Sequence, residues 1–246
     1  MDRLIYTAFS GLSSSMVRQR VVAANMANAQ TVGYRADTVS FTPMTLKGDS
    51  LEVRAMNETE VYGANMAAGS LVRTGKPLDI ALDGRAMLTV QATDGKEAYT
   101  RRGDLSVDPT GLLVNGDGVP VMGQGGPITV PPNREVVIAP DGQVMLGDPG
   151  APDTPPVALD RLKLVNPAGT RVEKGLDGLF RVYGGGVLPT DEQAKVVVGN
   201  LEQSNVNASD VLVQMIAAQR LFDIRTKLVA TAKEIDEGGS QLMKLA

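Results

Sequence analysis

The residues of this chain that could carry out chemistry are few, because the sequence contains no cysteine and no histidine. Thiolate nucleophiles, imidazole bases, disulfides and zinc sites built from these residues are therefore excluded. Three aspartates, Asp104, Asp108 and Asp117, invite comparison with a calcium site, but their spacing does not match the EF-hand pattern. We interpret them as solvent-exposed loop residues, and we expect no metal site.

Two glycine-rich runs invite comparison with phosphate-binding loops. The run at residues 123–126 is followed by Pro127 instead of Lys-Ser/Thr, and no helical pattern follows residues 184–186. Turn geometry explains both runs better. The two carboxylates of a glycosidase can meet in space without a sequence signature, but five tyrosines, four phenylalanines and no tryptophan offer few platforms for a sugar. We predict no enzymatic activity and no cofactor.

Charge and hydropathy narrow the possible partners. The chain has 24 basic and 28 acidic residues, and only Arg101 and Arg102 are adjacent basic residues. Nucleic-acid binding needs basic clusters, so we predict no nucleic-acid partner. No run approaches the roughly 20 apolar residues of a membrane span, and the first residues lack the pattern of a signal peptide. We expect neither an integral membrane protein nor a cleaved signal peptide.

The distribution of proline separates the ends of the chain from its middle. All 14 prolines lie between Pro43 and Pro189. Since proline breaks helix interiors, both ends are free to form long helices. Residues 3 to about 28 show an a/d pattern over about three heptads. Its apolar members are Ile5, Phe9, Leu12, Met16, Ala23 and Met26.

The second predicted helix runs from about residue 209 to 245, with Ser209 or Asp210 as its cap. Its first stripe consists of Ala217, Leu221, Ile224, Leu228, Ile235, Leu242 and Leu245. A second stripe beside it consists of Val211, Met215, Ala218, Phe222 and Val229. Two stripes exceed what one partner helix requires. We therefore predict contacts with both the N-terminal helix and neighbouring subunits; the alternative is a helix packed only on its own domain.

The middle of the chain predicts short strands. Apolar runs of three or four residues are separated by Asp-Gly pairs beginning at residues 83, 94, 117, 141 and 177, which favour tight turns. The predicted fold class is α+β, with a sandwich or barrel-like β domain at residues 77–200. Residues 1–32 and 201–246 form the predicted helical coiled-coil domain, and residues 33–76 connect the two.

Several motifs occur in a characteristic order along the chain. Residues 24–35 read Ala-Asn-Met-Ala-Asn-Ala-Gln-Thr-Val-Gly-Tyr-Arg, residues 199–206 read Gly-Asn-Leu-Glu-Gln-Ser-Asn-Val, and residues 215–222 read Met-Ile-Ala-Ala-Gln-Arg-Leu-Phe. Together with the segments at 77–81 and 99–103, they resemble the flagellar basal-body rod and hook family. Val32 stands where that family usually has proline. The sequence after residue 82 and the short stretch from 35 to 70 are similar to the proximal-rod member.

The resemblance implies a structural subunit that assembles with copies of itself and with other rod proteins into a torque-transmitting axle. It also implies export by the flagellar type III apparatus without a cleaved signal, and a place in the periplasmic rod. The terminal helices would form an inner coiled-coil layer and the β domain an outer layer. The predicted assembly residues are Ile5, Phe9, Leu12, Met16, Met26, Asn25, Asn28, Gly33, Tyr34, Leu201, Asn205, Val206, Met215, Arg220, Leu221, Phe222, Ile224, Leu228, Ile235 and Leu242.

Three other interpretations stay open at this point. The chain could be a distal-rod subunit of the same family. It could be a stand-alone exported β-rich binding module whose helices pair only within the monomer. It could also be an enzyme acting on peptidoglycan, although no local carboxylate motif supports that activity.

Overall fold

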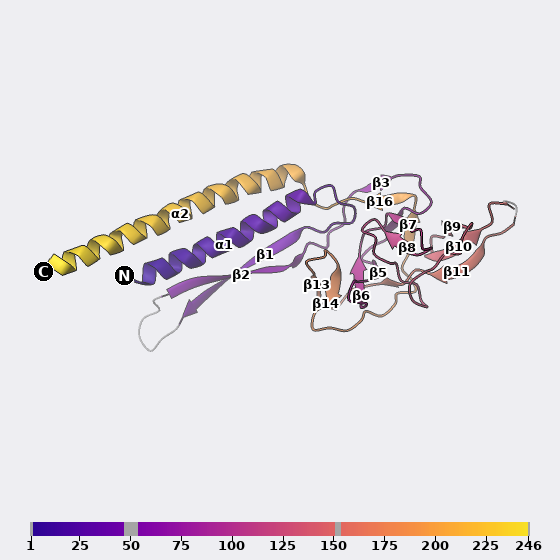
Figure 1. The fold of residues 1–246 in the computed structure, drawn as a ribbon, viewed down its shortest axis with the longest axis horizontal. Coiled ribbons are helices and arrows are strands. Elements are labelled where there is room, and N and C mark those ends of the chain that lie inside the picture. The colour runs from indigo at the N-terminus through magenta and orange to yellow at the C-terminus, as the bar shows by residue number, and fades with distance from the viewer. Residues whose placement is uncertain (1, 47–53, 151–153, 246) are drawn as a thin grey trace. The chain divides into compact units, whose positions relative to one another are not determined.

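The computed structural model describes residues 2–46, 54–150 and 154–245 (Figure 1), without the side chains of 2–7, 41–46, 54–62, 236 and 238–245. The chain forms two compact units. The first contains Met1–Ala27, Asp37–Gly63 and Asn207–Ala246, and the second contains Asn28–Ala36 and Ala64–Val206. Both units are discontinuous in sequence, so the chain passes between them four times.

The first unit contains both predicted helices. Helix α1 spans Asp2–Ala27 and α2 spans Ala208–Leu245, and the two lie side by side (Figure 1). The side chain of Asn207 caps α2, because its Oδ1 accepts hydrogen bonds from the backbone N–H groups of Ser209 (3.0 Å) and Asp210 (3.4 Å). The predicted cap at Ser209 or Asp210 was therefore wrong: the observed cap lies two or three residues earlier in the chain. Strands β1 (Asp37–Leu46) and β2 (Arg54–Ala64) form a two-stranded sheet in the predicted connecting region.

The second unit is built from short antiparallel strands. They are β3 (Leu71–Arg73), β4 (Ile80–Leu82), β5 (Met87–Gln91), β6 (Glu97–Thr100), β7 (Leu105–Val107), β8 (Leu113–Asn115), β9 (Glu135–Ile138), β10 (Gln143–Gly147), β11 (Val157–Arg161), β12 (Leu164–Val165), β13 (Val172–Lys174), β14 (Phe180–Val182), β15 (Val196–Val198) and β16 (Asn200–Glu202). One sheet has the order β12-β5-β6-β14-β13 and another β11-β10-β9. The remaining pairs are β15-β4, β16-β3 and β7-β8.

The predicted α+β class is confirmed, but the described strands form no closed barrel. Most of them have only three to five residues, so each pairs briefly with a neighbour before the chain turns away. The predicted Asp-Gly turns explain these interruptions. Their glycines, Gly84, Gly95, Gly118, Gly142 and Gly178, all have φ between 54° and 82°, a region that glycine enters without a steric cost.

In the five-stranded sheet, strands β5 and β6 are buried on both faces. Side chains alternate across a strand, so Leu88 and Ala98 belong to the main core while Met87 and Tyr99 belong to a smaller second cluster. The second cluster is completed by Val165, Phe180 and Leu188. Burial on both faces explains why β5 begins with an apolar run and shows no regular polar alternation.

Tyr99 gives the second cluster a polar anchor. Its side chain is fully buried, and its hydroxyl oxygen accepts a 2.7 Å hydrogen bond from the backbone N–H of Leu188. Burial raises the pKa of Tyr99 above its ordinary value, an effect that the hydrogen bond from Leu188 partly opposes. The folded state therefore favours the neutral phenol. This contribution to stability is complete below the ordinary pKa near 10 and is lost as the pH rises through the higher pKa of the folded state.

We expect Tyr99→Phe to lower the free energy of unfolding at pH 8 by about 1–3 kcal/mol, because the buried N–H of Leu188 loses its acceptor. At pH 10.5 the deficit should shrink. The phenol of Tyr99 then ionises in the unfolded wild-type chain and stabilises that unfolded state, whereas the phenylalanine variant has no phenol there. Urea unfolding at both values of pH measures the difference. Tyr183→Phe, at an exposed tyrosine, is the control. A deficit that stays constant with pH would contradict the assignment.

Candidate assembly interface

The two stripes of α2 have different environments in the first unit. The second stripe faces inward: Val211 and Ala218 are buried, and Met215, Phe222 and Val229 are half-buried. Ala232, one heptad after Arg225, continues it as a buried residue. This side of α2 thus supplies the intramolecular packing, so the predicted contact with the N-terminal helix is confirmed.

Arg225 occupies the gap in the second stripe between Phe222 and Val229. Its Nη1 donates hydrogen bonds to the carbonyl oxygen of Gly11 and to the hydroxyl of Ser15, the latter at 2.5 Å. Ser14 and Ser15 are both buried. The small residues of α1 that weaken its helix propensity therefore make room for a polar contact, and such a contact favours one register of the two helices.

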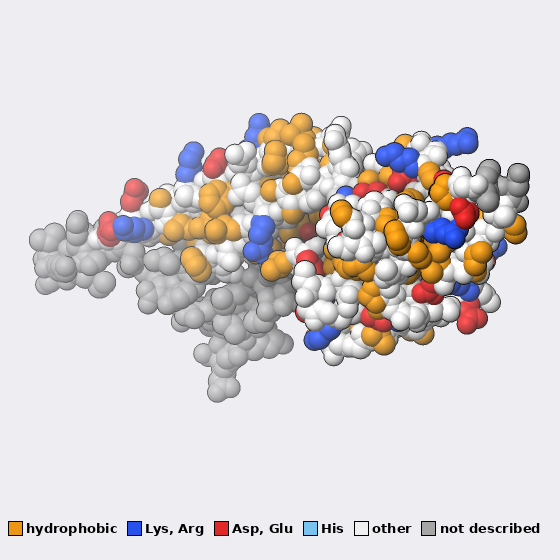
Figure 2. All heavy atoms as spheres, turned by 45° about the vertical axis from the view of Figure 1, so that its right-hand side comes forward, with side chains coloured by type: hydrophobic (Ala, Val, Ile, Leu, Met, Phe, Trp, Pro, Cys, Tyr) orange, Lys and Arg blue, Asp and Glu red, His pale blue; other side chains and the backbone are white. Residues whose placement is uncertain are grey.

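The first stripe of α2 lies beside the second, roughly 100° around the helix, and most of its described residues are exposed. Ile224, Leu228 and Ile235 expose 61%, 49% and 61% of their surface. On α1, Phe9 and Met16 are likewise exposed. Figure 2 shows hydrophobic side chains gathered over the described part of the helical unit. Contiguous exposed apolar residues of this size mark interaction surfaces.

The remaining predicted assembly residues have several environments. Leu12, Met26 and Leu221 are half-buried, Arg220 is exposed, and the side chains of Ile5 and Leu242 lie outside the described residues. Asn25 is buried, and its amide exchanges two hydrogen bonds with the backbone of Asp37, at 2.8 and 3.0 Å. It therefore fixes the start of β1 against the end of α1. Six predicted residues instead belong to the second unit: Asn28, Gly33, Tyr34, Leu201, Asn205 and Val206.

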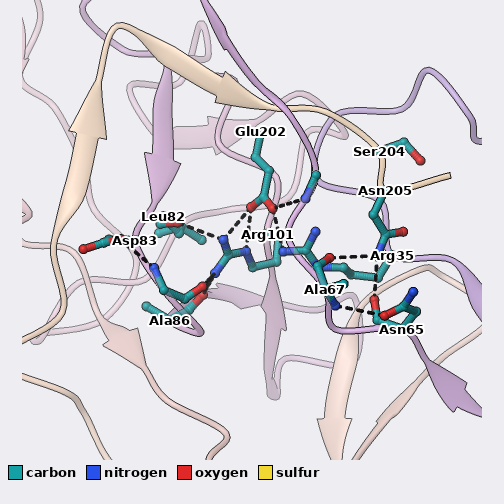
Figure 3. Close-up of polar contacts among 12 residues, drawn as sticks. Arg35, Asn65, Ala67, Leu82, Asp83, Ala86, Arg101, Glu202, Ser204 and Asn205 are labelled. Carbon is teal, nitrogen blue, oxygen red and sulfur yellow. Dashed lines mark hydrogen bonds and ion pairs between the residues drawn. The ribbon is translucent and has the colours of Figure 1, made fainter. Parts of the chain in front are cut away.

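A buried ion cluster brings the N- and C-terminal motifs together in the second unit (Figure 3). Glu202, at the end of β16, is 1% exposed. Its Oε1 accepts hydrogen bonds from Arg35 Nη2 at 2.6 Å and from the backbone N–H of Gly69 at 2.9 Å. Its Oε2 accepts from Arg101 Nε at 2.8 Å and Nη2 at 2.5 Å. One carboxylate is thus shared by two buried guanidinium groups.

Arg101 also anchors this cluster to the main core. It donates hydrogen bonds to the carbonyl oxygens of Leu82 (2.8 Å), at the end of β4, and of Gly84 (3.0 Å) and Ala86 (2.5 Å), in the turn that leads to β5. Burial lowers the pKa of Arg101, and the carboxylate of Glu202 opposes that shift. A guanidinium remains protonated in proteins, so its burial depends on this complete set of acceptors.

Asn205 satisfies every polar atom of its amide between two other segments. Its Oδ1 accepts from the backbone N–H of Ala36 at 2.8 Å. Its Nδ2 donates to the carbonyl oxygens of Asn65 at 2.7 Å and Ala67 at 2.8 Å (Figure 3). Its backbone N–H also donates to the carbonyl oxygen of Tyr34 at 3.3 Å. Asn205 therefore connects the segments on either side of the β1–β2 hairpin.

Two glycines allow these segments to approach closely. Gly33 has φ of 67°, and a Cβ atom there would lie 2.5 Å from the carbonyl carbon of Arg101. A Cβ atom at Gly69 would lie 1.9 Å from the carbonyl oxygen of Gln203. Neither position tolerates a larger residue without a backbone shift. The turn before Gly33 forms with Val32 in place of proline, since Thr31 N–H donates to Asn28 and Tyr34 N–H donates to Thr31.

Arg35, Arg101 and Glu202 all lie within the sequence motifs, but no role was predicted for any of them. Arg101 and Arg102 were considered only as a pair too small for a basic patch. The missed signal was the presence of charged residues of both signs within motifs that lie far apart in the chain. Charged residues there are expected to be paired, because an unpaired buried charge is costly.

Comparison with known proteins identifies the family. Three family profiles match: Flagella basal body rod protein over residues 5–35, Flagellar hook protein FlgE/F/G D1 domain over 81–146, and Flagellar basal body rod FlgEFG protein C-terminal over 197–242. The flagellar basal-body rod protein FlgF of Salmonella typhimurium is 39% identical over 252 residues, covering 100% of both chains. The chain belongs to the flagellar basal-body rod protein family.

Two further relatives of this rod-family chain refine the comparison. FlgF of Escherichia coli is also 39% identical with full coverage of both chains, whereas FlgG of Bacillus subtilis is 30% identical over 96% of this chain and 97% of its own. The predicted resemblance to the FlgF member, described above as the proximal-rod member, is confirmed. The relatives are structural rod proteins, so the prediction that this rod-family chain is not an enzyme is confirmed as well.

Among the residues that the structure describes, no helix is both long and apolar enough to cross a membrane. The same residues contain no group of three or more acidic side chains placed to hold a metal ion.

Proposed function

We propose that this protein is a structural subunit of the proximal part of the flagellar basal-body rod. The observation that carries the proposal is the exposure of Phe9, Met16, Ile224, Leu228 and Ile235, which we call the assembly surface. These residues belong to the a/d pattern, yet each keeps between 49% and 65% of its surface exposed while α1 and α2 are paired. They are therefore available to other subunits, both copies of this chain and other rod proteins.

Burial of the assembly surface supplies the driving force for assembly. Each large apolar side chain removed from water contributes about 1.5–3 kcal/mol before the cost of ordering. A contact that joins different surfaces of successive copies, without closing into a ring, builds a helical assembly. Coiled-coil packing between the helices of neighbouring subunits would then form the inner layer of a rigid axle that transmits torque.

Localisation and export follow from the same proposal. The subunit would act in the periplasmic part of the basal body and reach it through the flagellar export apparatus, without a cleaved signal peptide. The absence of cysteine suits that route, because no disulfide has to form or break when the chain is unfolded for passage.

Two alternatives lead to different outcomes. A distal-rod subunit would share the surface but act further along the rod, so cells lacking it would still build the proximal part. A stand-alone exported binding module would keep its helices paired within the monomer and would not associate.

We expect hydrogen exchange of the purified chain to depend on assembly. At low concentration, residues 8–27 and 208–235 should exchange much faster than residues 87–100 of the five-stranded sheet, because only contacts with other subunits complete the burial of the helices. At concentrations where association occurs, protection of the helices should rise while the sheet stays unchanged. Mass spectrometry resolves both regions. Equal, concentration-independent protection throughout would favour the stand-alone module.

A further inference from the structure

We infer that Glu202 and Asn205 form a clamp that holds together every segment through which the chain leaves the second unit. The chain passes between its two units after residues 27, 36, 63 and 206. On the side of the second unit, these passages are reached through the segments 28–36, 64–70 and 199–206. The clamp lies among these three segments.

The clamp connects each segment to both of the others. Glu202 joins its own strand to Arg35 and to the N–H of Gly69, and its carbonyl oxygen accepts from Gly33 N–H at 2.7 Å. Asn205 joins the same segments through Ala36 and Asn65. Two backbone hydrogen bonds complete the set: Asn65 N–H to the oxygen of Ala36 at 2.7 Å, and Gln203 N–H to the oxygen of Ser70 at 2.8 Å.

The chemistry of the clamp fixes position more than it adds stability. Replacing a buried ion cluster by apolar side chains is often neutral or stabilising. An apolar contact, however, tolerates sliding, whereas a guanidinium fork or an amide holds its partners in one geometry. Because Arg35 and Arg101 share a single buried carboxylate, withdrawal of the Glu202 strand leaves two unneutralised cations. Arg35 and Arg101 therefore lose their counter-ion together, whereas the amide contacts of Asn205 form a separate part of the clamp.

Arg101 connects the clamp to the main core through its three hydrogen bonds to the end of β4 and the turn that leads to β5. A force applied to the chain at any of the four passages is thus distributed over the whole second unit, and it does not detach a single segment from that unit. This mechanical role rests on the proposed rod function, in which torque passes through each subunit. The arrangement of the clamp itself does not depend on that function.

Asn205→Ala in the full-length protein tests the clamp. Amides in residues 31–36 and 65–70 should exchange about tenfold faster or more, while those of residues 87–100 keep their protection. Asn200→Ala, which removes only a local bond to the oxygen of Val198 in the adjacent strand, should change neither region. Unchanged exchange at 31–36 and 65–70, or a uniform increase that includes the core, would overturn the inference.

A second variant separates the two sides of the clamp if the first one fails to fold. Asn205→Asp keeps an acceptor for Ala36 N–H but loses the donors to Asn65 and Ala67, so exchange should rise at 65–70 and stay unchanged at 31–36. The opposite pattern would contradict the assignment. Swimming speed in viscous medium tests the mechanical role: it should fall for Asn205→Ala and stay normal for Asn200→Ala. If deletion of the whole chain leaves motility intact, the rod function fails, while the exchange result still judges the clamp.

Discussion

Replacing Leu228 by aspartate should abolish rod assembly and motility while the second unit stays folded. Leu228 is 49% exposed on the first stripe of α2, so an aspartate there remains hydrated in the separate subunit and costs little stability. In an assembled rod the same carboxylate would be buried without a partner, at a cost of several kcal/mol. The predicted loss is therefore specific to assembly.

Cells that carry Leu228→Asp in place of the normal gene should form no swarm in soft agar, and their isolated basal bodies should lack a complete rod. Thr226→Asp is the matched control, since it places the same charge at an exposed position on another side of α2. It should swim normally. Normal motility of the Leu228 variant would show that the assembly surface does not contact neighbouring subunits as proposed.

Arg101→Lys should lower the free energy of unfolding of the second unit by about 3–5 kcal/mol. Lysine carries the same charge, but its ammonium cannot reach both Glu202 and the three carbonyl oxygens at the end of β4 and in the turn to β5 that the guanidinium joins. Unpaired acceptors would then remain in the core.

The neighbouring residue provides the control. Arg102 pairs with Asp104 and Asp117 in a partly exposed network, so Arg102→Lys should cost less than about 1 kcal/mol. The measurement is urea unfolding monitored by hydrogen exchange of the β5 and β6 amides, which reports on the second unit alone. Equal losses for the two variants would show that the buried cluster contributes no more than a surface ion pair.

These two predictions differ in how far the sequence alone anticipated them. The first stripe, including Leu228, was predicted as an interface from its heptad spacing. The exposure of this stripe and the inward orientation of the second stripe depend on how α2 packs on α1, so the heptad spacing alone could not predict them. Two parallel stripes look equivalent in sequence, and the choice between them depends on the partner's small residues, Gly11 and Ser15, and on Arg225.

Features with local causes can be predicted from the chain alone. These are the two proline-free terminal helices, the Asp-Gly turns, the α+β class and the motifs that place the chain in its family. Capping, turn geometry and helical periodicity act over a few residues, so they can be read directly from the chain. The cap of α2 was misplaced because Ser209, Asp210 and Asn207 are all good capping residues, and only the backbone geometry selects among them.

The arrangement of the short strands and the cluster around Glu202 depend on contacts between distant segments. Arg35 and Glu202 are 167 residues apart in sequence, and Arg101 and Glu202 are 101 apart. No local pattern links such residues, because their pairing is imposed by the burial of charge after three distant segments have met. For the same reason, strands of three residues could be recognised one by one but not assigned to sheets until the core around them had closed.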